Sequence, residues 1–220
     1  AINVVGTGTG GSHTIASIGD PDVNGAAATV DGTGAVHVSA QHTLNPLNVE
    51  LPSSITDVIG DVSIPLTSLA AAAGGSAGDS KPGLAGSAAI NIYDTSTHAR
   101  VDRNAQVGQG GSHNASLTVS ATDTTVIKSG AGSVGIGVSG SGIGAGLDLG
   151  IVDKDTRAVI GQNALVTTTG MTSVTAASSE DLLSVSANAG IGGSGVGVAA
   201  SASVEVLTTH TRAYIDSGAQ

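Results

Sequence analysis

One short phrase, Thr-x-Ala-x-Ile/Val followed by Gly or Asp, constrains the fold of this chain more than any other feature. Its four copies begin at Thr14, Thr97, Thr156 and Thr211. A second phrase, Val-Ser/Thr-Ala, follows three of these copies, at residues 38–40, 119–121 and 174–176. An internal repeat of this kind predicts a stacked array in which neighbouring units bury each other's apolar faces.

The spacing of the phrases defines the units. Val119 and Ala158 are 39 residues apart, and Val174 and Ala213 are again 39 apart, whereas the first unit is about 22 residues longer. We therefore expect residues 1–220 to be a single solenoid segment of a longer tandem array. The expected units are about 1–88, 89–147 and 148–202, with a partial unit at 203–220.

The composition favours a thin all-β core. The chain has 34 Gly and two Tyr but no Phe, Trp or Cys, and 40% of its residues are hydrophobic. Without large aromatic side chains, backbones that face each other across the core must lie close together. Small and β-branched residues on a Gly-rich background suit a narrow β-solenoid.

Strict alternation of apolar residues with glycine predicts long strands. Residues 134–138 alternate Val or Ile with Gly, and after a slip at 140–142 the alternation continues to Ile151. Glycine, Ser, Asp148 and Glu205 fall on the opposite face to the apolar residues. We interpret each unit of about 55 residues as two or three coils, giving about eleven coils of about 20 residues in a rod roughly 50 Å long.

Glycines that persist on one strand face indicate close approach of another backbone. The neighbour is a following coil of the same chain or a second chain. We therefore predict that two rods pack laterally through a glycine-rich face at Gly135, Gly137, Gly144 and Gly146.

A proline-rich insertion interrupts the first unit at about residues 44–86. It holds four of the five prolines, Pro46, Pro52, Pro65 and Pro82. Proline cannot donate to a strand ladder, so this segment should leave the regular stack. Within it, the run at residues 66–74 predicts a short helix that ends at a glycine.

Charge and composition exclude several classes of partner. The net charge of −10, with only seven Lys and Arg, argues against binding to nucleic acid and against adsorption to anionic lipid. No 20-residue window is apolar enough for a membrane-spanning helix, so we expect no membrane insertion. An acidic, Cys-free chain favours an extracellular or cell-surface location.

The repeat unit resembles those of very large bacterial surface proteins. It joins an Ala/Gly-alternating strand to Thr-Arg-Ala-Tyr-Ile-Asp at residues 211–216 and to Val-Ser-Ala-Thr-Asp-Thr-Thr at residues 119–125. These features are similar to repeats of filamentous-haemagglutinin-like and repetitive adhesins. The resemblance implies a right-handed parallel β-helix outside the cell, with roles in cell adhesion and biofilm, and it brings no catalytic residues.

The six histidines suggest no zinc site. His13 and His113 follow identical Gly-Gly-Ser segments, and His98 and His210 occupy nearby repeat positions on one expected face. Zinc needs three or four convergent ligands, so these residues and His37 and His42 are interpreted as solvated.

Calcium is the more serious metal candidate. Asp20 with Asp22, and Asp153 with Asp155, have the spacing of oxygen ligands on a turn. The Gly-rich nonapeptide of calcium-binding β-rolls is missing, however. We assign no metal ligand, and structural calcium stays as an open alternative.

Nothing in the sequence indicates an enzyme. Asp102 with Arg100 and Arg103 is the one compact charged cluster, and residues 153–157 are its counterpart one unit later; both are interpreted as a solvated ridge. We assign no catalytic and no cofactor-binding residue. The predicted function is a non-enzymatic structural or adhesive shaft that pairs with flanking repeats or with copies of itself. The alternative is a module that binds a host or matrix glycan or protein through the 44–86 insertion, and a remote one is a polysaccharide-active β-helix enzyme.

Overall fold

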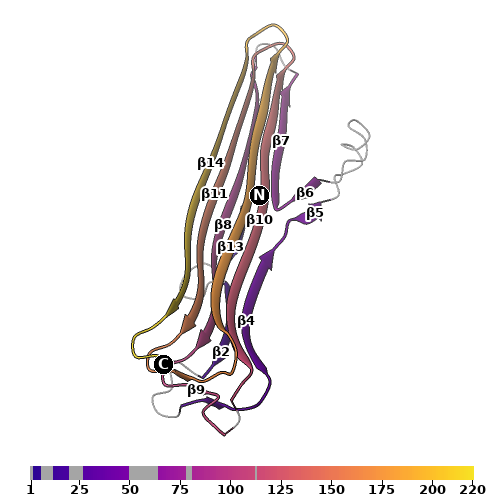
Figure 1. Cartoon of the computed structure of the whole chain (residues 1–220). Coiled ribbons are helices and arrows are strands. Elements are labelled where there is room, and N and C mark those ends of the chain that lie inside the picture. The colour runs from indigo at the N-terminus through magenta and orange to yellow at the C-terminus, as the bar shows by residue number, and fades with distance from the viewer. Residues whose placement is uncertain (1, 6–11, 20–26, 50–63, 78–80, 112) are drawn as a thin grey trace.

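The computed structural model describes residues 2–5, 12–19, 27–49, 64–77, 81–111 and 113–220. These residues form strands and turns, with no helix among them. Two sheets of very long strands face each other and give the chain the shape of a blade (Figure 1). Within the described ranges, then, nothing has the helical length and hydropathy needed to cross a membrane.

Sheet I is built on three long strands in parallel, with two shorter strands beside the first of them. The long strands are β8 (Gly83–Val101), β11 (Gly142–Ile160) and β14 (Gly197–Ile215), and the short ones are β1 (Ile2–Val5) and β2 (Ser12–Ile18).

Sheet II faces sheet I and is also parallel throughout. Its central strand is β10 (Ser116–Gly137), flanked on one side by β13 (Thr172–Gly192) and on the other by β4 (Ala35–Leu44) and β7 (Ser68–Ser76).

The chain alternates between the two sheets and advances by the same distance in both. Leu117 pairs with Thr172 in sheet II and Gly142 pairs with Gly197 in sheet I, which is an offset of 55 residues each time. One 55-residue passage therefore contains one long strand of each sheet, an arrangement compatible with a β-solenoid.

The prediction of 20-residue coils is wrong. The alternating pattern continues without turn residues for the 19 to 22 residues of each long strand. Residues 138–141, where the alternation slips, form the turn between the sheets and not a defect within a strand. The long dimension of the blade, roughly 70 Å, consequently follows the strands, and the stack itself is only a few strands high.

The four copies of the repeated phrase lie side by side in sheet I, so the alignment made from the sequence is confirmed. Thr97 pairs with Thr14 and with Thr156, and Thr156 pairs with Thr211. We call this end of the blade the base, and the opposite end, with turns at residues 138–141 and 193–196, the tip.

Each copy at the base ends in a tight turn that uses left-handed backbone angles. Asn104 and Asn163 have φ values of 59° and 57°, and Gly218 has 73° at the equivalent place in the last turn. The turns were predicted from Asn, Asp and Gly, residues that tolerate this conformation. They lead into a small parallel sheet made of β3 (Thr29–Val30), β9 (Gln106–Val107) and β12 (Leu165–Val166).

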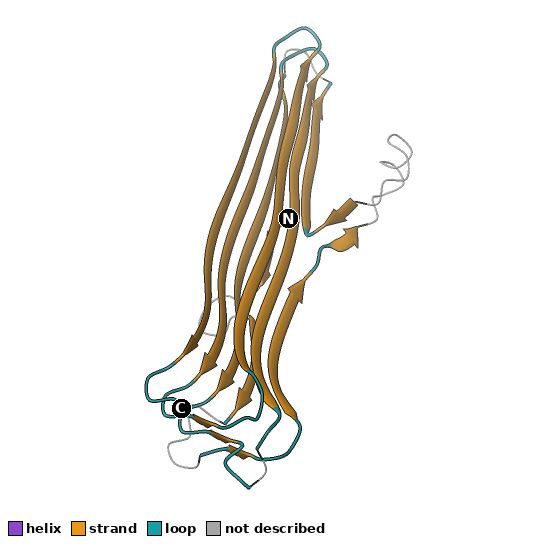
Figure 2. Ribbon diagram, in the orientation of Figure 1, coloured by secondary structure: helices purple, strands orange, loops and turns teal. Residues whose placement is uncertain are grey.

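The insertion leaves the stack over a shorter range than predicted. Strands β5 (Leu47–Val49) and β6 (Ile64–Leu66) form an antiparallel pair that projects from the blade (Figure 2). Residues 50–63 lie outside the described part of the chain. The chain rejoins sheet II at Ser68 and sheet I at Gly83.

The helix predicted at residues 66–74 is wrong, because most of that run lies in β7. The alanines pair in register with β10, opposite Gly132 and its neighbours. Helix propensity is a weak preference that tertiary pairing overrides, and small side chains fit beside the glycine-rich β10.

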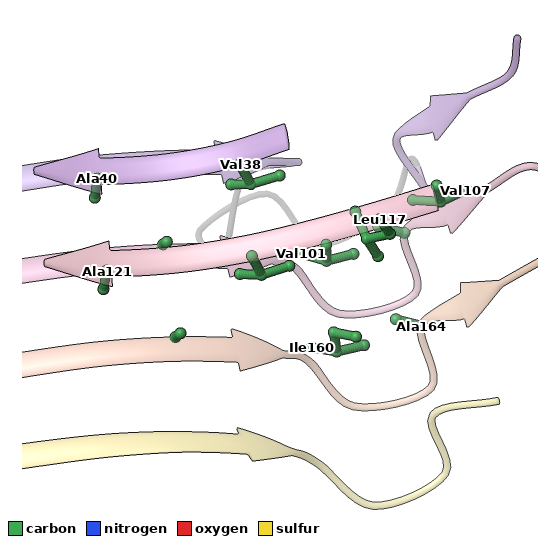
Figure 3. Packing of buried hydrophobic residues seen from close by; sticks show 12 residues of the cluster. Val38, Ala40, Val101, Val107, Leu117, Ala121, Ile160 and Ala164 are labelled. Atoms are coloured by element: carbon green, nitrogen blue, oxygen red, sulfur yellow. The ribbon is translucent and has the colours of Figure 1, made fainter. Parts of the chain in front are cut away.

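The core at the base matches the predicted thin core of Val, Ile and Ala. Figure 3 shows Val38 and Ala40 of β4 beside the equivalent residues of the neighbouring coils. Val101, Val107, Leu117 and Val119 are fully buried in this cluster.

Toward the tip the two faces of the strands exchange roles. Glycines point inward, and apolar residues such as Ile136 and Val138, 41% and 61% exposed, point outward. A Cβ added to Gly135 would lie 2.5 Å from the carbonyl carbon of Ile143, a backbone atom of the facing sheet. The predicted lateral packing of two rods through the glycine face is therefore wrong: the closely approaching backbone belongs to the same chain.

Candidate functional site

A buried ion cluster joins the two sheets nearer the base than the tip. The ammonium Nζ of Lys154 in β11 donates to Asp123 Oδ1 in β10 at 2.6 Å and to Glu180 Oε1 in β13 at 2.8 Å. The side chains of Lys154 and Asp123 are each only 1% exposed. A buried charge needs such partners, because desolvation of an unpaired one costs several kcal/mol.

Hydroxyl groups complete the surroundings of the Asp123 carboxylate. Thr97 and Thr125 each donate to it at 3.0 Å, and His42 Nδ1 lies 3.2 Å from its Oδ2 atom. Burial acts to raise the pKa of Asp123, but the hydrogen bond and charge of Lys154, with both threonine hydroxyls, hold that pKa below its ordinary value. The cluster is therefore built to keep Asp123 ionised inside the blade.

A second polar layer lies farther toward the tip. Asp148 of β11 is fully buried, and its Oδ2 atom accepts hydrogen bonds of 2.6 Å from Ser129 and from Ser184 of sheet II. Glu205 of β14 lies beside it. Burial raises the pKa of Glu205 and the Asp148 carboxylate adds to the rise, while a hydrogen bond from Ser184 acts in the opposite direction.

The outer face of sheet I near the base carries a group of exposed and half-buried ionic residues. Asp155 accepts from Arg157 at 2.6 Å, and it lies 3.3 Å from His98 Nε2 and 3.7 Å from Arg212. Burial lowers the pKa of His98, because the opposing effect of Asp155 is smaller and Arg157 and Arg100 add to the lowering.

A shallow hollow of about 220 Å³ adjoins this group at the turns of the base. Its lining includes Tyr214, Arg103 and the pair Arg100–Asp102, in which Arg100 Nε lies 3.0 Å from Asp102 Oδ1. The Asp102 side chain is 7% exposed. The interpretation of a wholly solvated ridge is thus wrong for Asp102 and for Lys154, although Asp153 and Arg103 are exposed.

The described histidines do not converge on a common point. His98 and His210 do lie on the same outer face of sheet I, as predicted, but Asp155 lies between them in the ladder. His42 points into the core, His13 bonds Ser96, His37 is exposed and His113 donates to the carbonyl oxygen of Gly108.

Across the described ranges, no three His, Cys, Asp or Glu residues gather as metal ligands would. Asp20 and Asp22 lie outside those ranges. Asp153 is exposed, whereas Asp155 is occupied by the arginine and histidine contacts described above.

Sequence reasoning missed the two polar layers of the interior. A signal was present: Lys154 stands among alternate residues that the strand period places inward, and so do Asp123 and Asp148. Because charge normally marks the solvent face, the period was read with the wrong weight at these positions.

Comparison of the chain with family models, with curated proteins and with solved structures finds no match. The functional argument therefore rests on the geometry of the blade and on the residue pattern.

Proposed function

We propose that this chain is a non-enzymatic structural unit, a segment of a right-handed parallel β-helix that forms the shaft of an extracellular bacterial surface protein or fibre. The observation that carries the proposal is the common 55-residue offset of both sheets. Any unit with this offset can repeat indefinitely, because each new strand meets a partner of equal length and similar sequence.

Connection geometry supports the right-handed form. Parallel strands of one sheet are joined through a strand of the other sheet, and crossovers of this kind are right-handed in about 98% of cases. The resemblance to filamentous-haemagglutinin-like repeats, together with the acidic Cys-free composition, supports the location outside the cell.

An open strand edge supports extension of the stack. Among the described strands, β14 pairs only with β11, and nearly all of its residues are exposed. Unpaired edges of this length recruit further strands, so flanking repeats of the same chain or further copies of it would continue the ladder.

Insertion of one extra unit tests the proposal. A second copy of residues 142–196 placed after Val196 should fold as an added coil. The chain would still unfold in a single transition, and its urea m-value would rise by about a quarter, in proportion to the added length. The control carries the same inserted residues in scrambled order. An m-value that is equal in the two proteins, or selective proteolysis of the inserted copy, would refute the repeat-unit reading.

A second candidate function, binding of a glycan or protein ligand, is favoured by the β5–β6 pair. It departs from the parallel stack and projects from the blade at the proline-rich insertion, as binding loops on rigid scaffolds do (Figure 2). Replacement of residues 45–66 by a Gly-Ser linker should abolish adhesion to a glycan and matrix-protein panel while leaving the unfolding midpoint nearly unchanged. Adhesion that survives the replacement would locate the binding surface elsewhere.

A further inference from the structure

The polar layer around Asp148 contains buried atoms that the protein itself leaves unpaired. Asp148 and Asn91 are 0% exposed and Ser68 is 7% exposed. Nevertheless, Asp148 Oδ1, Ser68 Oγ, Glu205 Oε2 and both amide atoms of Asn91 have no hydrogen-bond partner within the described residues. Each unpaired buried group costs about 1–3 kcal/mol, so several together in one layer point to a bound species that satisfies them.

Strand register brings these groups into one place. Gly150 of β11 pairs with Asn91 of β8 on one side and with Glu205 of β14 on the other. A Cβ built on Gly150 would lie 2.6 Å from Oε1 of Glu205 and closer still to its Oε2, so the carboxylate occupies the space of the missing side chain. Glu205 thereby turns into the interior, toward the rung of Asn91.

Asp148 belongs to the same layer. It precedes Gly150 by two residues on the inward face of β11, which places the two positions roughly 7 Å apart along the strand. Its Oδ2 atom is already occupied by Ser129 and Ser184, and Ser129 pairs with Ser68 in sheet II. Asp148 Oδ1 is the atom left free to bind something else.

We propose that this layer binds one hard divalent cation of the calcium type, with Asp148 Oδ1, the Glu205 carboxylate and Asn91 Oδ1 as protein ligands. Carboxylate and amide oxygens are the ligands that Ca²⁺ prefers, and two carboxylates balance its charge. Ser68 Oγ and water molecules complete a coordination shell of six to eight oxygens. The cation joins β8, β11 and β14, three successive strands of sheet I, and the site is independent of the proposed function.

Calcium binding is measured on the whole chain after removal of metal with EDTA. Calorimetric titration with CaCl₂ should give one site per chain, and the thermal unfolding midpoint should rise with Ca²⁺. Glu205→Gln and Asp148→Asn should each weaken the affinity at least tenfold. Gly150→Ala should do the same while retaining every ligand, because its methyl group displaces the Glu205 carboxylate.

Asp181→Asn is the matched control, since it removes one negative charge from the outer face of β13. Its Ca²⁺ affinity should equal that of the original chain. Terbium provides a positional readout: Tyr93, fully buried, is the next inward residue after Asn91, roughly 7 Å along β8, and should sensitise bound Tb³⁺. Tyr214→Phe should leave this emission intact because Tyr214 lies at the base.

The competing explanation is a proton shared between Asp148 and Glu205. It predicts no heat of Ca²⁺ binding, no Ca²⁺-dependent midpoint and full stability for Glu205→Gln, whose amide replaces the shared hydrogen bond. Those results would overturn the proposal, as would Ca²⁺ affinity that is unchanged in both Glu205→Gln and Gly150→Ala. These two variants keep the test decisive if Asp148→Asn fails to fold, because Glu205 is partly exposed and Gly150 has no left-handed φ.

Discussion

The exchange of faces along the strands can be tested with two glycines of the same strand. Gly135 of β10 points into the blade near the tip, whereas Gly130 points outward on the same strand. Alanine at either position changes the unfolded chain identically and adds one methyl group. The difference between the two variants therefore reports only on what the methyl group meets in the folded blade.

The expected magnitudes follow from the surroundings of each Cβ. At Gly130 the nearest atom would be Leu69 Cδ1 at 3.5 Å, an ordinary contact, so Gly130→Ala should be neutral or stabilising by about 0.5 kcal/mol. At Gly135 the Cβ would lie 2.5 Å from the carbonyl carbon of Ile143, although real Cβ atoms stay beyond 3.0 Å. The two sheets must separate locally by at least about 0.5 Å, and overpacking of this kind costs about 1–3 kcal/mol.

Urea unfolding followed by circular dichroism measures both variants against the original chain. We expect Gly135→Ala to be less stable than Gly130→Ala by about 2 kcal/mol, with equal m-values. Equal stability of the two alanine variants would show that Gly135 does not face the backbone of sheet I, and the inverted tip would have to be abandoned.

Three further predictions concern charged side chains. Lys154→Met should lower the free energy of unfolding by about 3–5 kcal/mol because Asp123 loses its buried cation, whereas Lys128→Met, on the outer face, should stay within about 0.5 kcal/mol; equal losses would contradict a buried cluster. Because the pKa of Asp123 is lowered in the fold, its stabilisation is complete above the ordinary carboxyl pKa and is lost as pH falls through the folded value, so urea midpoints below about pH 4 should fall less steeply in Asp123→Asn than in the original chain. The lowered pKa of His98 has the same sign, since the unfolded chain takes up its proton first; stability should decline as pH falls below about 6.5, and an NMR titration of the imidazole that gives a midpoint above this value would refute the burial argument.

The sequence contained the strand period and the register but not the direction of burial. The four copies beginning at Thr14, Thr97, Thr156 and Thr211 align in the sheet as they align in the sequence, because identical side chains form the ladders. A period of two shows that residues alternate between faces, yet it is symmetric about which face is inside. At the tip, glycine is inside because two backbones need the space, and an apolar scale assigns that side to solvent.

Coil length and the interior layers depend on contacts distant in sequence. Turn residues at 138–141 look like a slip within one strand until the facing sheet is present to receive the chain. The alanine run of β7 has helical character in isolation, and only its pairing with β10 makes it a strand. For Lys154 the sequence supplied the inward position but not the carboxylates of two other strands that make burial tolerable.

The 55-residue passage also determines how chain length is converted into size. Each added passage would raise a stack by only about 4.8 Å but would widen both broad faces by a strip roughly 70 Å long. A thousand residues would thus build a plate under roughly 100 Å high, whereas coils of 20 residues would build a mast more than twice as tall. A protein assembled in this way gains display area much faster than reach, and hydrogen bonds aligned with the growth direction share a pull along that direction over the whole width of the plate.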